Sequence, residues 1–357
     1  MLDRLIAAAR GLNTRDNWNR LGIALSLVVI GFALMTLVHM LRGVEPAKIY
    51  AAFKAIPARN IVIAGMLVAA AYVTLTFYDW FALRTIGKLH VPYRVAAFAA
   101  FCSYSIGHNI GATVFTGNAI RFRIYSAYGL TIVDIAKLAF VTGLTFWLGN
   151  AVMLGLGIAY EPEAATAVNK LPPAINQGLA AAVLLLIAAY LFWVGRAARI
   201  VGRDDWQVTL PTARLTLVQI GIGILDLGLS SLAMYMLLPP GADSDFIAIL
   251  VTFIFATLLG FASHAPGGIG VFDAAMMVAL PQFPKEELLA SLLLFRLLYY
   301  ITPFTLALTL VGARELWASF AGRTAGLPKT ELKTEPKMKS RVAATAAKRK
   351  TRKSASS

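Results

Sequence analysis

Charged residues and cysteine are both scarce in this 357-residue chain. Charged residues make up 14% of the sequence, whereas a typical soluble domain has about a quarter. Hydrophobic residues make up 58%, the mean hydropathy is +0.69, and the apolar residues gather in long blocks. Cys102 has no second cysteine to pair with, which excludes an internal disulfide and is typical of a small core residue. This composition predicts an integral membrane protein.

Motifs of several enzyme classes are also missing. The sequence contains no H-E-x-x-H, no G-x-S-x-G and no G-x-x-x-x-G-K-[ST], and no histidine–cysteine cluster suited to a metal. Asp79 and Asp273 could resemble the paired aspartates of membrane proteases, which share a water between two carboxylates. That scheme requires Gly-x-Gly-Asp, and Asp273 lies two residues too far beyond Gly270. We therefore expect no enzymatic activity, no cofactor and no metal, with an intramembrane aspartyl enzyme as an alternative.

The positive charge is concentrated at the C-terminus. The formal net charge is +15, and eleven lysines and arginines against two glutamates from Arg323 onward supply +9 of it. This segment has no aromatic residue that could stack on bases, so we do not expect it to bind nucleic acid. Its composition predicts a disordered basic tail, 321–357, on the cytoplasmic side, in contact with anionic lipid headgroups.

The N-terminus has a basic start followed by an apolar run of span length. That run is longer than the core of a signal peptide and is not followed by a small-residue cleavage site, so it predicts a first transmembrane helix. Residues 1–20 are then a cytoplasmic segment. The apolar blocks of the chain are 22–41, 61–83, 95–118, 138–159, 178–195, 214–238, 246–263, 269–281 and 288–313.

The distribution of charge between these blocks argues against a simple series of crossings. If every block except the short 269–281 crossed the bilayer, the arginine-rich loop 196–214 would lie outside. The acidic connection holding Asp243 and Asp245 would lie inside. Both placements contradict the excess of positive charge on cytoplasmic loops.

The conflict disappears if two regions are hairpins that enter and leave on one side. Residues 95–130 would form a cytoplasmic hairpin, and residues 246–281 a hairpin from the opposite side. The predicted fold is an all-α polytopic membrane protein with about six full transmembrane helices and two oppositely oriented re-entrant hairpins. These eight or so membrane segments form an integral membrane domain over 21–320. Both termini are then cytoplasmic.

The two predicted hairpins have similar interruptions. The first breaks at "SIGHNIGATVF" and the second at "FASHAPGGIGVF", so each contains His-x-x-Gly, beginning at His108 and at His264. A span, a hairpin and a span on each side, in opposite orientation, predict an inverted repeat of the kind found in transporters. Each histidine either satisfies a backbone carbonyl or takes part in a relay.

The second interruption is rich in residues that stop a helix. Pro266 removes a hydrogen-bond donor, while Gly267, Gly268 and Gly270 permit a turn and a close backbone approach. A new helix starting near Ile269 would direct its positive N-terminal end into the protein, where an anion such as phosphate can bind. The alternative is a kinked helix whose glycines only allow neighbouring helices to pack closely.

Four charged residues lie at membrane depth, inside the ends of their apolar blocks: Asp79, Asp226, Asp273 and Arg296. Asp226, Asp273 and Arg296 are expected to face a partner or a cavity, because intramembrane charges are costly. Arg296 would pair with Asp226 or Asp273, as a structural lock or as a gate that a substrate opens. Asp79 lies near the end of its block, so its carboxylate could reach the interface. Asp79, Asp226 and Asp273 are the candidate proton or cation sites.

Arg121 and Arg123 lie where the first hairpin leaves the membrane. A guanidinium suits bidentate contact with phosphate, so one interpretation is a clamp for a lipid headgroup. The other is ordinary anchoring at the interface.

At these residues the sequence resembles a known family. The stretches "TGNAIRFRIYSAYGL", "SHAPGGIGVFD" and "FRLLYYITPF" look like the membrane domain of the lysylphosphatidylglycerol synthase/flippase proteins, the multiple peptide resistance factors. The likeness covers roughly residues 20 to 315. It implies a stand-alone flippase domain in a bacterial cytoplasmic (inner) membrane, linked to resistance against cationic antimicrobial peptides. Many relatives have glutamate where this chain has Asp273, and the synthase domain is absent.

The resemblance and the residues together predict a lipid translocator. Its substrate would be a phospholipid, aminoacylated phosphatidylglycerol among the candidates, and its partners would be membrane lipids. The sequence leaves open a homo-oligomer, a separate lipid-modifying enzyme, transport of a small soluble ion, and a non-transporting accessory protein that acts through its tail. The candidate pathway residues are His108, Arg121, Arg123, Asp226, His264, Pro266, Gly267, Gly268, Gly270, Asp273 and Arg296.

Overall fold

The computed structural model describes residues 46–111, 113–203, 206–239 and 245–324. By its internal contacts the chain divides into two units, Met1–Val311 and Gly312–Ser357, and the description below concerns the first. The predicted N-terminal segment 1–20, the first span 22–41 and the tail beyond 324 lie outside the described residues.

Five long apolar segments within the described residues are suited to crossing a membrane. The first four are single helices, namely α4 (Ala58–Thr85), α7 (Ile132–Tyr160), α9 (Pro173–Arg196) and α10 (Ala213–Leu237). The fifth, Lys285–Arg314, consists of α13 (Lys285–Arg296), the π-helical turn η3 (Leu297–Ile301) and the start of α14 (Thr302–Thr324). All five fall on predicted blocks, which confirms a helical, multi-span membrane protein.

The two regions predicted as hairpins are each broken into shorter helices. The first contains α5 (Tyr93–Ile110) and α6 (Thr113–Tyr125), and the second contains α11 (Phe246–Ala262), the short turn η2 (Pro266–Gly268) and α12 (Val271–Ala279). The longest of these has 18 residues, or about 27 Å, which is less than the ~30 Å of a bilayer core. These lengths are at the lower limit for a crossing, so the re-entrant course of both regions and the side from which each enters stay predictions.

Each broken region folds back on itself. In the first, the Ser103 hydroxyl on α5 donates to the carbonyl oxygen of Gly117 on α6 at 2.8 Å, so the two helices run side by side. In the second, Gly260 of α11 lies against Gly268 and the Cβ atom of Phe272. Small residues at these contacts allow the helices to approach closely.

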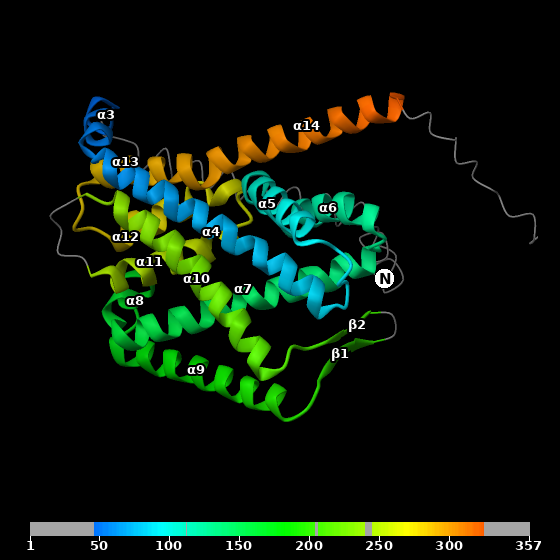
Figure 1. Ribbon diagram of the computed structural model, residues 1–357. Helices are drawn as coiled ribbons and strands as arrows, with labels where there is room; N and C mark the ends of the chain where they lie inside the picture. The colour runs from blue at the N-terminus through cyan, green and yellow to red at the C-terminus, as the bar shows by residue number, and fades with distance from the viewer. Residues whose placement is uncertain (1–45, 112, 204–205, 240–244, 325–357) are drawn as a thin grey trace, which may run out of the picture. The chain divides into compact units, whose positions relative to one another are not determined.

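Helices α4 and α10 pack side by side, and α7 packs against α10 (Figure 1). A Cβ atom added to Gly149 of α7 would lie 2.6 Å from the Cα atom of Gly223 on α10, so the two backbones touch there. The main apolar core lies between α4, α10, α11, α12 and α13. Its largest buried side chains include Tyr78, Met234, Phe272, Met276 and Phe295.

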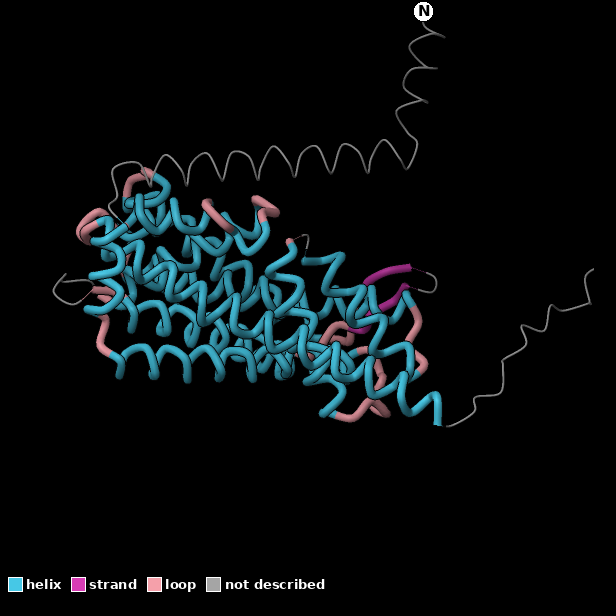
Figure 2. The backbone as a smooth tube through the Cα atoms, turned by 90° about the horizontal axis from the view of Figure 1, so that it is seen from above, coloured by secondary structure: helices cyan, strands magenta, loops and turns pink. Residues whose placement is uncertain are grey.

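The basic loop after α9 adds a small β-ribbon to the otherwise mostly helical fold. Residues Ile200–Arg203 (β1) and Trp206–Thr209 (β2) form an antiparallel ribbon, the magenta strands of Figure 2. Val208 is buried and Trp206 packs edge-on against Phe140 of α7. These contacts hold a hairpin that four-residue strands could not maintain alone. The remaining short helices are α3 (Pro46–Ala55), η1 (Ser126–Tyr128) and α8 (Pro162–Asn169).

Candidate functional site

The interruptions of the two hairpins touch each other inside the protein. Gly111, which ends α5, has φ 83° and ψ 178°, a conformation essentially restricted to glycine. A Cβ atom on Gly111 would lie 3.2 Å from the carbonyl oxygen of His264 and 3.3 Å from Pro266. The backbone of one break is therefore packed on the backbone of the other.

The second break depends on left-handed backbone conformations. Gly267, Gly268 and Gly270 have φ values of 59°, 61° and 82°, and the non-glycine His264 has φ 55°. These values confirm that the glycines make the turn rather than only permitting close packing. The new helix begins at Val271, with Gly270 as its N-cap, two residues later than predicted.

Asp273 and Arg296 form an ion pair that closes this break. The Arg296 Nη2 and Nε atoms lie 2.6 Å and 2.9 Å from the two carboxylate oxygens of Asp273. Arg296 Nη1 also donates to the carbonyl oxygen of Gly267 at 2.9 Å. Of the two predicted partners for Arg296, the structure selects Asp273.

The N-terminal end of α12 is not open to an external anion, which corrects the predicted anion site. The Gly270 N–H donates to Asp273 Oδ2 at 3.0 Å, so the helix caps itself with its own carboxylate. Asp273 is 4% exposed, and its oxygens are shared between this N–H group and Arg296. The expectation that Asp273 and the helix end both face a headgroup is therefore wrong for this conformation.

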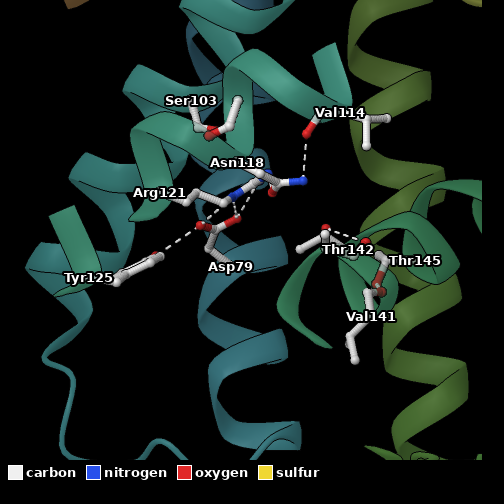
Figure 3. A network of polar contacts seen from close by, with 11 residues as sticks. Asp79, Ser103, Val114, Asn118, Arg121, Tyr125, Val141, Thr142 and Thr145 are labelled. Carbon is white, nitrogen blue, oxygen red and sulfur yellow. Dashed lines mark hydrogen bonds and ion pairs between the residues drawn. The ribbon is translucent and has the colours of Figure 1, made fainter. Parts of the chain in front are cut away.

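A second buried ion pair joins the first hairpin to α4 (Figure 3). Arg121 of α6 donates to both carboxylate oxygens of Asp79, with Nη2 2.7 Å from Oδ1 and Nε 3.0 Å from Oδ2. The Tyr125 hydroxyl donates to Oδ2 at 2.8 Å, and Asn118 Oδ1 accepts from Arg121 Nη1 at 3.2 Å. Asp79 is fully buried and Arg121 is 5% exposed.

This pair overturns two expectations. Asp79 does not reach the interface, because Arg121 satisfies its charge inside the protein. Arg121 is neither a surface anchor nor an open phosphate clamp, because its guanidinium is bonded to Asp79. Arg123, two residues further along α6, is exposed. Asp79 and Asp273 bond to different arginines rather than to each other, unlike the shared-water pair of an aspartyl enzyme.

Asp226 of α10 has a different environment. Its Oδ2 atom accepts a hydrogen bond from the Tyr78 hydroxyl at 3.1 Å. Its Oδ1 atom is buried and has no hydrogen-bond partner among the described residues. Asp226 is thus the intramembrane aspartate that is not bonded to an arginine in the described part of the chain.

A cavity of about 420 Å³ lies between the two hairpins and brings these groups together. Both interruptions, the π-helical turn and the middles of α4, α7 and α10 contribute to its wall. Its polar lining includes Tyr78, Tyr104, His108, Asn118, Arg121, Thr142, Asp226, Thr257, His264, Tyr299 and Tyr300. His264 Nδ1 lies 2.9 Å from the Ala262 carbonyl oxygen, as the carbonyl-satisfying interpretation predicted.

The cavity wall continues into apolar side chains exposed on the outside of the bundle. Phe115 is 78% exposed, Trp147 is 52% exposed, and Phe261 also reaches the surface. Trp147 and Phe261 pack edge-on, with ring centroids 6.3 Å apart. The cavity therefore combines mostly apolar walls with a smaller group of polar side chains.

Several cavity residues were not predicted from the sequence. Tyr78, Tyr104, Tyr299 and Tyr300 belong to aromatic-rich apolar blocks, in which nothing distinguishes a cavity tyrosine from a core one. The feature that could have identified them in the sequence is the tyrosine hydroxyl group, because a buried tyrosine usually needs a hydrogen-bond partner. The Tyr72 hydroxyl, for example, donates at 2.9 Å to the Tyr299 carbonyl within the π-helical turn.

No family model matches the chain. An uncharacterized protein of Synechocystis sp., slr0712, is 29% identical over 270 residues, which cover 75% of this chain and 84% of that protein. The inner membrane protein YbhN of Escherichia coli is 26% identical over 249 residues, 68% of this chain and 76% of YbhN. The phosphatidylglycerol lysyltransferase of Staphylococcus haemolyticus is 23% identical over 287 residues, 77% of this chain but 32% of the enzyme.

These similarities agree with the fold. Together with the apolar helices, the similarity to the inner membrane protein YbhN supports a helical membrane protein. The chain spans about a third of the length of the lysyltransferases it matches. The similarity to those enzymes is weak, and it is compatible with the flippase-domain resemblance drawn from the sequence motifs.

Proposed function

We propose that the chain translocates a phospholipid between the leaflets of a bacterial cytoplasmic membrane. The observation that carries this proposal is the cavity between the two broken regions, which has mostly apolar walls and a smaller group of polar side chains, and which extends to exposed apolar residues. A lipid has the same division, because its headgroup needs polar contacts and its acyl chains need an apolar path.

The lining residues suggest how a lipid would be arranged. The headgroup would occupy the interior beside Asn118, Thr142 and Arg121. The acyl chains would lie along Phe115 and Trp147 and remain in the bilayer. Such a path moves only the polar part through the protein, so the cavity need not enclose a whole lipid.

The ion pairs suggest where the moving parts are. Each hairpin is fastened to a neighbouring helix by one buried arginine–aspartate pair, and the two hairpins touch at Gly111 and Pro266. Movement of one repeat against the other would open this contact to one side at a time, as in alternating access. In this mechanism both termini are cytoplasmic, as the charge distribution predicts.

The substrate class follows from the similarity to phosphatidylglycerol lysyltransferases. Phosphatidylglycerol and its aminoacylated form are the first candidates. An aminoacylated substrate would be supplied by a separate lipid-modifying enzyme. We expect the protein to act on membrane lipids without itself being an enzyme.

A cavity-filling variant tests the proposal. Purified protein would be reconstituted with headgroup-labelled phosphatidylglycerol or lysylphosphatidylglycerol, and the probe reaching the outer leaflet would be quenched. Gly143 lines the cavity and has no atom within 4 Å of an added Cβ, so Gly143→Trp should fill the space without a backbone clash. Gly221→Trp is the matched control, because Gly221 is on α10, equally uncrowded and not part of the lining.

We expect wild type and Gly221→Trp to expose the probe faster than empty liposomes, and Gly143→Trp to match empty liposomes. Transport by Gly143→Trp at the wild-type rate would remove the cavity from the pathway. If wild type moves neither lipid under any ion gradient, the accessory-protein alternative takes precedence. Removing residues 324–357 would then abolish the function, whereas a translocator should keep its transport.

A further inference from the structure

The three intramembrane aspartates are not equivalent. Asp79 and Asp273 each accept two or more hydrogen bonds from an arginine. Asp226 accepts one hydrogen bond, from the Tyr78 hydroxyl, and its Oδ1 atom has no partner in the described part of the chain. The buried carboxylate of Asp226 therefore has no arginine to offset the cost of burying its charge, whereas Asp79 and Asp273 each have one.

The surroundings of Asp226 are polar but mostly uncharged. The titratable groups that act on it are phenols, namely Tyr72 and Tyr78 of α4, Tyr104 of α5 and Tyr299 of the π-helical turn. Arg121 and His108 line the same cavity, but the Arg121 guanidinium is bonded to Asp79. The side chain is 5% exposed and faces the cavity, so water or a solute entering the cavity is what can reach it.

We propose that Asp226 is a proton-binding site whose occupancy is coupled to entry of the lipid headgroup; this rests on the proposed function. The proton binds Oδ1 and converts the carboxylate to a neutral carboxylic acid, while Oδ2 continues to accept from Tyr78. Release returns the proton to water in the cavity and restores the anion. No other bond is made or broken.

The coupling is electrostatic. A phosphate headgroup and an ionised Asp226 in one cavity of about 420 Å³ repel each other in a medium of low dielectric constant. Protonation of Asp226 removes the repulsion, so proton and headgroup bind together. By linkage, a bound headgroup must raise the affinity of Asp226 for a proton by the same factor as the bound proton raises the affinity of the cavity for the headgroup. A lower pH on the side from which the lipid enters should therefore favour loading.

Infrared difference spectroscopy tests the proton site without requiring transport. Protein in phosphatidylglycerol vesicles would be taken from about pH 5 to about pH 8, a range in which a perturbed carboxyl group can titrate. We expect a protonated-carboxyl C=O band that is lost on alkalinisation and is missing in Asp226→Asn. That variant is nearly isosteric and retains an oxygen that can accept from Tyr78. Asp245→Asn is the matched control, because Asp245 is an exposed helix cap, and it should keep the band.

Translocation under a pH gradient tests the coupling. With the entry side one pH unit more acidic, the wild-type rate should rise by up to about tenfold, the change in proton activity. Asp226→Asn should translocate with no dependence on the gradient. If lipid moves but the band is absent, or Asp226→Asn keeps the wild-type pH dependence, the proposal is overturned while the proposed function stands.

Two further outcomes separate the failures. If the band titrates but no lipid moves, the proton site stands and both the proposed function and its coupling fail. If the wild-type rate follows a sodium gradient at constant pH and Asp226→Asn abolishes this dependence, Asp226 binds a metal cation, and the proton assignment is overturned.

Discussion

Each of the two hairpins is joined to a neighbouring helix by a buried arginine–aspartate pair, but the positions of the two charges are reversed. In the first, the hairpin carries the arginine, Arg121, and the neighbouring α4 carries Asp79. In the second, the hairpin carries Asp273, and the following α13 carries Arg296. The helices of the two broken regions are shorter than the five long apolar segments and so have less apolar surface to hold them in place. A buried ion pair fixes each region to a long helix.

The breaks themselves also differ. The first is made at Gly111, whereas the second uses four residues with positive φ between His264 and Gly270. Arg296 donates to two carbonyl oxygens within the second break, at Gly267 and Gly268. The Arg121 ion pair lies further along its hairpin, ten residues beyond Gly111. The first pair therefore fixes a helix, and the second fixes both a helix and the break.

The largest effect should follow from disrupting the more buried pair. Arg121→Ala leaves Asp79 fully buried without its cation, so we expect a loss of about 3–5 kcal/mol in the free energy of unfolding. Denaturant unfolding of the protein in detergent micelles measures this loss. The control is Arg94→Ala, an exposed arginine on the neighbouring helix α5, with an expected change within about 0.5 kcal/mol.

A double variant checks the physical reason. Adding Asp79→Asn to Arg121→Ala removes the uncompensated charge, so the double variant should be more stable than Arg121→Ala alone. If the two substitutions simply add, the cost of Arg121→Ala arises from lost packing and not from a stranded carboxylate.

The next largest effect should come from the second pair. Arg296 has a side chain 12% exposed, against 6% for Arg121, so partial solvation should reduce the cost of Arg296→Ala to about 2–4 kcal/mol. Because Arg296 also bonds to the break, amide hydrogen exchange should increase over residues 264–270, measured by mass spectrometry.

The control for this prediction is Lys285→Ala, an exposed position at the start of the same helix. Exchange over 264–270 should stay at the wild-type level in that variant. Arg121→Ala should disturb the helix α6 more than its break. An equal increase at both breaks in Arg296→Ala would contradict the distinction between the two hairpins.

The sequence predicted the arrangement of the segments better than their contacts. The span positions and both breaks follow from block length, charge distribution and the residues Pro266 and Gly270, which act locally. Asp79 and Arg121 are 42 positions apart, and their pairing depends on how α5 packs against both α4 and α6. Hydropathy carries no information about that packing. The π-helical turn likewise cannot be predicted from the local sequence, because its carbonyl oxygens accept hydrogen bonds from distant side chains such as Tyr72 and Asn109.

Arg296 shows where the limit lies. The sequence left two partners open, Asp226 and Asp273, because both lie within apolar blocks. The choice is made by the turn at Gly267–Gly270, which brings the first turn of α12 to the Arg296 guanidinium. The choice also leaves Asp226 without an arginine, which is the property on which the proposed proton site depends.

The smallest effects should come from the glycines and should rank the two breaks. Gly111→Ala places a side chain at φ 83° and ψ 178°, against the backbone of His264 and Pro266, at an expected cost of about 1–3 kcal/mol. Gly267→Ala also has positive φ, but its added Cβ would be 3.7 Å from its nearest neighbours, which are side-chain atoms of Arg296 and Tyr300. A cost of about 1–2 kcal/mol, mainly backbone strain, is expected there. Gly178→Ala, inside α9 with open space around it, should instead stabilise by up to about 1 kcal/mol.

The order of these values decides whether the contact between the breaks is rigid. Alanine at Gly111 can be accommodated only if the two hairpins separate, because its nearest neighbours are backbone atoms. If Gly111→Ala costs more than Gly267→Ala in unfolding and also slows headgroup translocation, the contact is part of the transporting structure. If Gly111→Ala is less costly than Gly267→Ala, the hairpins separate readily. The contact then belongs to one of two conformations of similar free energy, as a gate between two access states requires.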